Sequence, residues 1–80
     1  MTVKEVIGII CERKGLSTYE LADRLQIDRS TVSHTLSRND GMSMKIENFI
    51  KWLEELDYQV VIMPSYDDDD ELILDGESEL

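Results

Sequence analysis

The sequence predicts a mainly α-helical fold, with four helices followed by a short C-terminal β-strand or hairpin. Three observations carry this prediction. Apolar residues recur at helical spacing through residues 3–56. Capping residues and turn residues divide that stretch into short segments. Beyond it, a run of β-branched residues changes the period to one that is typical of a strand.

The first helix is expected over residues 2–14. Gly15 then supplies the left-handed residue that commonly ends a helix. Cys11 follows Ile7 at helical spacing and is interpreted as a small core residue, not as a reactive thiol. It is the one cysteine of the chain, which excludes an intramolecular disulfide. The inward face of this helix is predicted to consist of Val3, Val6, Ile7, Ile10 and Cys11.

The second helix begins with a clear signal. Ser17 and Glu20 form an S-x-x-E capping box, in which each side chain binds the backbone amide of the other residue. Leu16 and Leu21 stand where a hydrophobic staple would close over that cap. The pattern predicts a helix that starts at Thr18 and runs to about residue 26.

A third helix is predicted from about residue 29 to residue 38, because Ile27, Asp28 and Val32 repeat the staple and cap positions. Two or three residues separate it from the second helix, and Ala22 is small enough for the two helices to pack closely at a steep angle. Its outward or lateral positions are Arg29, Ser30, Ser33, His34 and Ser37, with Thr31 near the edge.

The C-terminal part is expected to begin with a turn at residues 39–42. Ser43 is the predicted cap of a fourth helix over residues 44–58, with Trp52 off its apolar stripe. The stripe consists of Ile46, Phe49, Ile50, Leu53 and Leu56.

Residues 59–63 predict a strand that Pro64 stops, and residues 71–75 predict a second, weaker strand. Because an isolated hairpin is marginal in water, these strands are expected to pack on the helices or to pair with a second chain. The predicted division is a helical domain over residues 1–58 and a strand or hairpin with an acidic tail over residues 59–80.

Charge is spread unevenly along the chain. The net charge is −10, but residues 1–64 contribute only −2 of it, whereas residues 65–80 contain eight acidic residues and no basic one. Since charges beyond about 8–10 Å are screened at ordinary salt, an acidic tail is compatible with a locally basic surface. The net charge does predict that non-specific binding to nucleic acid is weak, because such binding depends on the neutralisation of phosphates by basic side chains.

Two short helices joined by a tight turn form the layout of a helix-turn-helix. In that layout the first helix crosses the DNA backbone and the second presents its N-terminal half to base edges. Arg29 has the fork geometry for guanine O6 and N7, and serine, threonine and histidine side chains contact bases or phosphates. The alternative is a helical hairpin with a merely solvated outer face. The paired caps, Ala22 and the absence of acidic residues between Arg29 and Arg38 favour DNA binding.

The segment "LSTYELADRLQIDRSTVSHTLSR" resembles the helix-turn-helix of phage repressors, the Cro/cI or XRE family. The following "NDGMSMKIENFIKWLEELDYQVVIMP" resembles small phage and mobile-element members, in which a strand follows the last helix. The resemblance covers about residues 3–64. It implies a sequence-specific, repressor-like transcriptional regulator in which Thr18 and Tyr19 contact phosphate. It also implies that Arg29, Ser30 and His34 read bases, with Thr31 and Ser33 beside them. The basic residue Arg38 is added to the predicted DNA-binding set.

Three features depart from the family pattern. Gln26 stands where the family usually has glycine, so a non-glycine residue must make the turn. Leu36 replaces a residue that is often polar. The acidic segment 65–80 has no counterpart in the pattern.

A protein-directed function is the alternative to DNA binding: an anti-CRISPR-like nuclease inhibitor, or an antitoxin, that acts through residues 65–80. The plainer interpretation of that run is a solvated tail. An enzyme is not expected, because His34 is the only histidine and no cysteine or carboxylate has the spacing of a catalytic or metal site. No cofactor and no membrane association are expected. The composition favours a reduced, cytoplasmic setting, and the resemblance to phage repressors implies that the cell is bacterial or phage-infected.

A homodimer is expected, because one helix-turn-helix reads only a short half-site and two-fold pairing is the usual route to palindrome recognition. The surface assigned to it from the sequence consists of Trp52, Val61 and Ile62.

Overall fold

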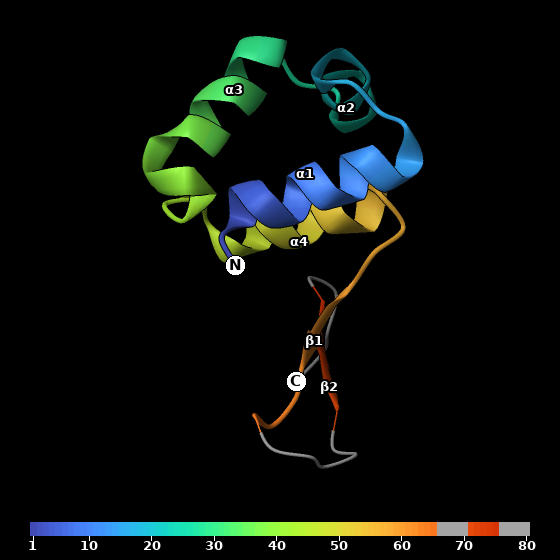
Figure 1. The fold of residues 1–80 in the computed structure, drawn as a ribbon, viewed down its shortest axis with the longest axis vertical. Helices are drawn as coiled ribbons and strands as arrows, with labels where there is room; N and C mark the ends of the chain where they lie inside the picture. Colours follow the sequence, from blue (N-terminus) through green and yellow to red (C-terminus); the bar gives the residue numbers. More distant parts are fainter. Residues whose placement is uncertain (66–70, 76–80) are drawn as a thin grey trace. The chain divides into compact units, whose positions relative to one another are not determined.

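The computed structural model describes residues 1–65 and 71–75, and it divides into two compact units, Met1–Met44 and Lys45–Leu80. The prediction of a mainly helical fold with a C-terminal hairpin is confirmed (Figure 1). The sequence-based division placed the fourth helix with the first three, whereas the contacts group it with the hairpin. The first unit contains α1 (Val3–Lys14), α2 (Thr18–Leu25), α3 (Arg29–Ser37) and the short 3₁₀ helix η1 (Arg38–Gly41).

The ends of α1 and α2 are set by local hydrogen bonds. The Ser17–Glu20 capping box is present, with the Glu20 amide donating to Ser17 Oγ at 3.3 Å. A second capping box, between Thr2 and Glu5, begins α1. Gly15 ends α1 in the left-handed conformation, as predicted, and its amide donates to the Glu12 carbonyl.

Gln26 makes the turn between α2 and α3. It takes the left-handed conformation, with φ 57° and ψ 42°, that glycine adopts most easily. Its amide donates to the Asp23 carbonyl and the Ile27 amide to the Ala22 carbonyl, so the end of α2 is closed by backbone bonds. Asp28 occupies the N-cap position of α3, as predicted, but its side chain makes no cap hydrogen bond.

The first unit has a small apolar core, and Val32 of α3 is completely buried in it. The other core residues are Ile7, Ile10, Leu21 and Ala22. At the far end of α3, η1 turns the chain back toward α1 through two left-handed residues, Asn39 and Asp40. A Cβ on Gly41 would lie 2.9 Å from Val3 Cβ, so the backbone of η1 lies directly against the start of α1.

The second unit contains α4 (Ile46–Glu55), β1 (Val60–Ile62) and β2 (Leu72–Leu74). Ser43 does not cap α4: the N-cap is Lys45, without a side-chain hydrogen bond. Trp52 does not lie off the buried face either, since its side chain is only 7% exposed. The buried face of α4 is made by Ile50, Trp52, Leu53 and Leu56, whereas Ile46, the first residue of the helix, is 61% exposed.

The hairpin forms as the sequence predicts, in fewer residues. β1 and β2 pair antiparallel, with Val60 opposite Leu74 and Ile62 opposite Leu72. Three paired positions are short for a sheet that has no third strand in the described part of the chain. Large apolar side chains remain exposed on it, namely Ile62, Met63, Leu72 and Ile73.

Candidate nucleic-acid interface

The polar face of α3 is open to solvent. Val32 turns inward and Leu36 is half-buried. The predicted outward residues are all exposed, which confirms the expected orientation of the helix: Arg29, Ser30, Thr31, Ser33, His34 and Ser37. No acidic residue interrupts this face between Arg29 and Arg38.

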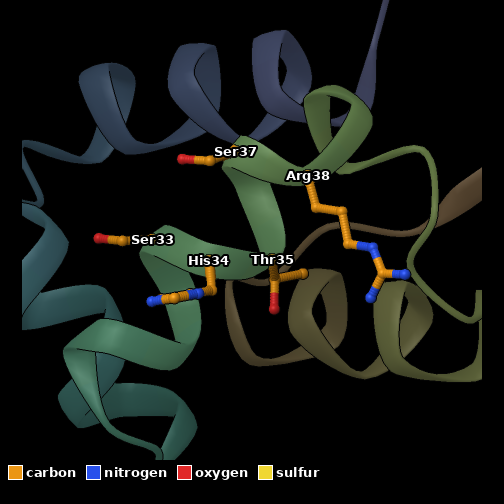
Figure 2. Close-up of a pocket in the computed structure, with 5 residues that line it drawn as sticks. All are labelled: Ser33, His34, Thr35, Ser37 and Arg38. Atoms are coloured by element: carbon orange, nitrogen blue, oxygen red, sulfur yellow. The ribbon is translucent and has the colours of Figure 1, made fainter.

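An open pocket lies along the C-terminal half of α3. It is lined by Ser33, His34, Thr35, Ser37 and Arg38. Figure 2 shows that Ser33, His34 and Ser37 project from one side of the helix, whereas Thr35 and Arg38 project from another. Ser37 follows His34 by three residues and Ser33 by four, so it lies one helical turn beyond these two hydrogen-bonding side chains.

The first turn of α3 is joined to α2 by an aromatic contact. The Arg29 guanidinium carbon lies 3.7 Å from the centre of the Tyr19 ring, within the range of a cation–π interaction. Tyr19 is nevertheless 64% exposed, so the pair stands at the surface. From the sequence, Tyr19 is expected to contact a phosphate and Arg29 to contact a base, but a contact between the two side chains is not predicted. The two residues are ten residues apart and on different helices, so the periodicity of one helix does not relate them.

The structure brings the predicted DNA-contacting residues together in two groups. Thr18 and Tyr19 occupy the first turn of α2, next to Arg29 through the ring contact. Ser33 and His34 lie in the later turns of α3, and Arg38 follows that helix as the first residue of η1. Arg29 begins α3 and Arg38 is its C-cap residue, so the helical rise per residue places the two about 13.5 Å apart along the axis of α3.

The two units differ in net formal charge. Residues 1–44 hold six basic and six acidic residues, which gives zero, whereas residues 45–80 hold two basic and twelve acidic residues, which gives −10. The unit that contains α2 and α3 is therefore neutral as a whole. The acidic segment 66–70 and residues 76–80 lie outside the described residues.

The residues assigned to a homodimer surface differ in exposure. Ile62 is 50% exposed and Val61 is half-buried. Trp52 is buried, which corrects its assignment to a surface that a second copy would touch. The exposed apolar residues of β2, Leu72 and Ile73, were not singled out from the sequence.

Outside α2 and α3, the described residues include the single thiol of the chain, that of Cys11 in α1. Burial raises the pKa of the Cys11 thiol above its ordinary value, which disfavours the reactive thiolate. Residues 1–65 and 71–75 contain no group of three histidine, cysteine or carboxylate side chains that would hold a metal ion. Over the same residues, every helix is too short or too polar to cross a bilayer.

Comparison of the chain with protein-family models, with curated proteins and with solved structures finds no match. The resemblance to phage-repressor helix-turn-helix proteins therefore stays a prediction from the sequence.

Proposed function

We propose that this chain is a sequence-specific DNA-binding regulator of the repressor type, from a phage or mobile element, acting in the cytoplasm of a bacterial or phage-infected cell. The observation that carries the proposal is the outer face of α3. It is exposed, polar and free of acidic residues, on a short helix held after α2 by a tight left-handed turn. These are the requirements of a helix that enters a major groove.

In this proposal α2 crosses the sugar–phosphate backbone and α3 enters the groove. Thr18 and Tyr19 lie in the first turn of α2, where hydroxyl groups meet phosphate. Arg29 and Ser30 lie in the first turn of α3, the part of a recognition helix that reaches base edges. Ser33 and His34 extend the contact by one turn, and Thr31 and Arg38 border it.

Specificity then rests on few contacts and little net charge. Residues 1–44 are neutral overall, so few phosphates are neutralised and binding to random DNA is weak. Base contacts must supply the difference, and a bidentate arginine–guanine pair contributes about 1–3 kcal/mol of discrimination.

The proposal includes a homodimer formed through the hairpin. The two strands pair over only three positions and expose apolar side chains, including Ile62 and Ile73. A second copy would cover these side chains and add strands to a sheet that is marginal by itself. Two-fold pairing would also present two recognition helices to a palindromic site.

In vitro selection from random duplex DNA at low salt tests the proposal. We expect an enriched, two-fold symmetric sequence, bound much more tightly than a scrambled duplex of the same composition. Failure to enrich or to bind any duplex at low salt would refute DNA binding.

The difference in net charge between the two units favours a second candidate function. Residues 45–80 carry the whole net charge of −10, and a strongly anionic surface can imitate DNA toward a basic protein groove. The second candidate is therefore a protein-directed module, such as a nuclease inhibitor or an antitoxin, that acts through the acidic C-terminal segment 65–80. Neutralising that segment separates the two functions, because it would strengthen DNA binding and abolish such an inhibitor.

A further inference from the structure

The Tyr19–Arg29 stack connects the two helices of the candidate interface at the point where base contacts are expected. The guanidinium carbon lies 3.7 Å from the ring centre, and both side chains are at the surface. An exposed arginine ordinarily samples many rotamers, and ordering it on binding costs free energy. A ring that already holds the guanidinium lowers that cost.

Stacking on a ring, unlike an ion pair, leaves the N–H donors of the arginine available for another partner. A guanidinium on a ring face is held by its π face, whereas its N–H donors point outward in its own plane. A carboxylate partner would occupy the same donors that guanine O6 and N7 require. Within residues 1–65 and 71–75, the Tyr19 ring is the partner that Arg29 has.

We propose that Tyr19 is a positioning residue for Arg29: its ring holds the guanidinium so that Arg29 selects guanine at one operator position. The inference rests on the proposed DNA-binding function and deepens it. It changes the role of Tyr19 that the family resemblance implies, from a phosphate contact to a determinant of base preference. The ring, and not the phenol hydroxyl, carries that role.

Two substitutions of Tyr19 separate the ring from the hydroxyl. Tyr19→Phe keeps the ring and removes the hydroxyl, whereas Tyr19→Leu removes the ring and keeps an apolar side chain in a helix-compatible position. Tyr19 is 64% exposed, so both variants should keep the fold, and circular dichroism checks that they do. Binding is measured on the selected duplex and on duplexes with each other base at the position that Arg29 reads.

We expect Tyr19→Phe to keep the guanine preference of the wild type. Tyr19→Leu should reduce that preference about two- to fivefold, which corresponds to the usual strength of an exposed cation–π contact. In an Arg29→Ala background, Tyr19→Leu should cause no further loss of preference, because the two residues act as one unit.

A second measurement does not depend on DNA. In the free protein, the Tyr19 ring current should shift the NMR signals of the Arg29 δ protons upfield, in the wild type and in Tyr19→Phe but not in Tyr19→Leu. An unshifted wild-type signal would overturn the inference. So would an equal loss of affinity on all duplexes in both variants, which would make Tyr19 a phosphate contact. If the wild type binds no DNA while the shift is present, the proposed function has failed and the stack itself stands.

Discussion

Three glycines of the first unit provide a graded test of how η1 is held against α1. Gly8 lies exposed within α1, with nothing within 4 Å of an added Cβ. Gly15 has a φ of 66° and equally open surroundings. Gly41 has a φ of 81°, and its added Cβ would lie 2.9 Å from Val3 Cβ and Cγ1 and 3.3 Å from the Lys4 amide nitrogen.

The same alanine substitution should therefore have three different effects. Gly8→Ala should stabilise the chain by about 0.5–1 kcal/mol, because alanine loses less entropy in a helix. Gly15→Ala should cost about 0.5–1.5 kcal/mol, because an L-residue is strained at positive φ and only part of this is offset by a less flexible unfolded chain. Gly41→Ala adds to this strain an overlap with Val3 that costs about 1–3 kcal/mol, so its total cost is about 1.5–4.5 kcal/mol.

Urea unfolding followed by far-ultraviolet circular dichroism measures these differences in unfolding free energy. The difference between the variants at Gly41 and Gly15 isolates the overlap with Val3, because both share the strain of positive φ. Equal losses at the two positions would refute the close approach of η1 to α1. A destabilising Gly8→Ala would refute its open helical environment.

Three further predictions concern the turn, the hairpin and the acidic segment. Gln26→Gly should raise the unfolding free energy by about 0.5–1 kcal/mol by relieving a non-glycine residue at φ 57°, and a loss in urea unfolding would contradict this. Ile62→Lys should convert a dimer into a folded monomer in solution light scattering, because Ile62 is 50% exposed, and a wild-type monomer at micromolar concentrations would contradict the dimer. Replacing Asp67, Asp68, Asp69 and Asp70 with asparagine removes four of the chain's negative charges and should tighten DNA binding, most of all at low salt, without altering base preference. Weaker or unchanged DNA binding, together with loss of a protein partner, would favour the protein-directed function.

Sequence patterns predicted the helices best where a cap made their ends explicit. The Ser17–Glu20 box and Gly15 set the boundaries of α1 and α2 to within a residue. The same rule would have found the Thr2–Glu5 box, which was overlooked although it has the same spacing. The start of α4 was misplaced at Ser43, because a serine before an apolar stripe imitates a cap.

The burial of individual residues of α4 and the contact between α2 and α3 depend on tertiary structure, and the local sequence pattern did not predict them. Trp52 stands off the stripe that Ile46 and Phe49 suggest, but the buried face of α4 is centred nearer Leu53 and Leu56. Ile46 is the first residue of α4, so no preceding helical turn covers its side chain, which is exposed. The outward face of α3 was predicted correctly because Val32 and Leu36 alone fix its orientation, whereas the contact of Tyr19 with Arg29 depends on the angle between two helices.

The central claim is that α3 reads bases, and the effect of Arg29→Ala on specificity tests it most directly. Arg13→Ala is the matched control, because it removes the same charge from an exposed position of the same unit outside α2 and α3. Binding of both variants is measured by titration on the selected duplex and on a scrambled duplex. Arg29→Ala should weaken binding to the selected duplex by about 1–3 kcal/mol and relax preference at one position, whereas Arg13→Ala should leave base preference intact. Equal losses for Arg29→Ala on both duplexes, or the same effect from Arg13→Ala, would contradict base reading by α3.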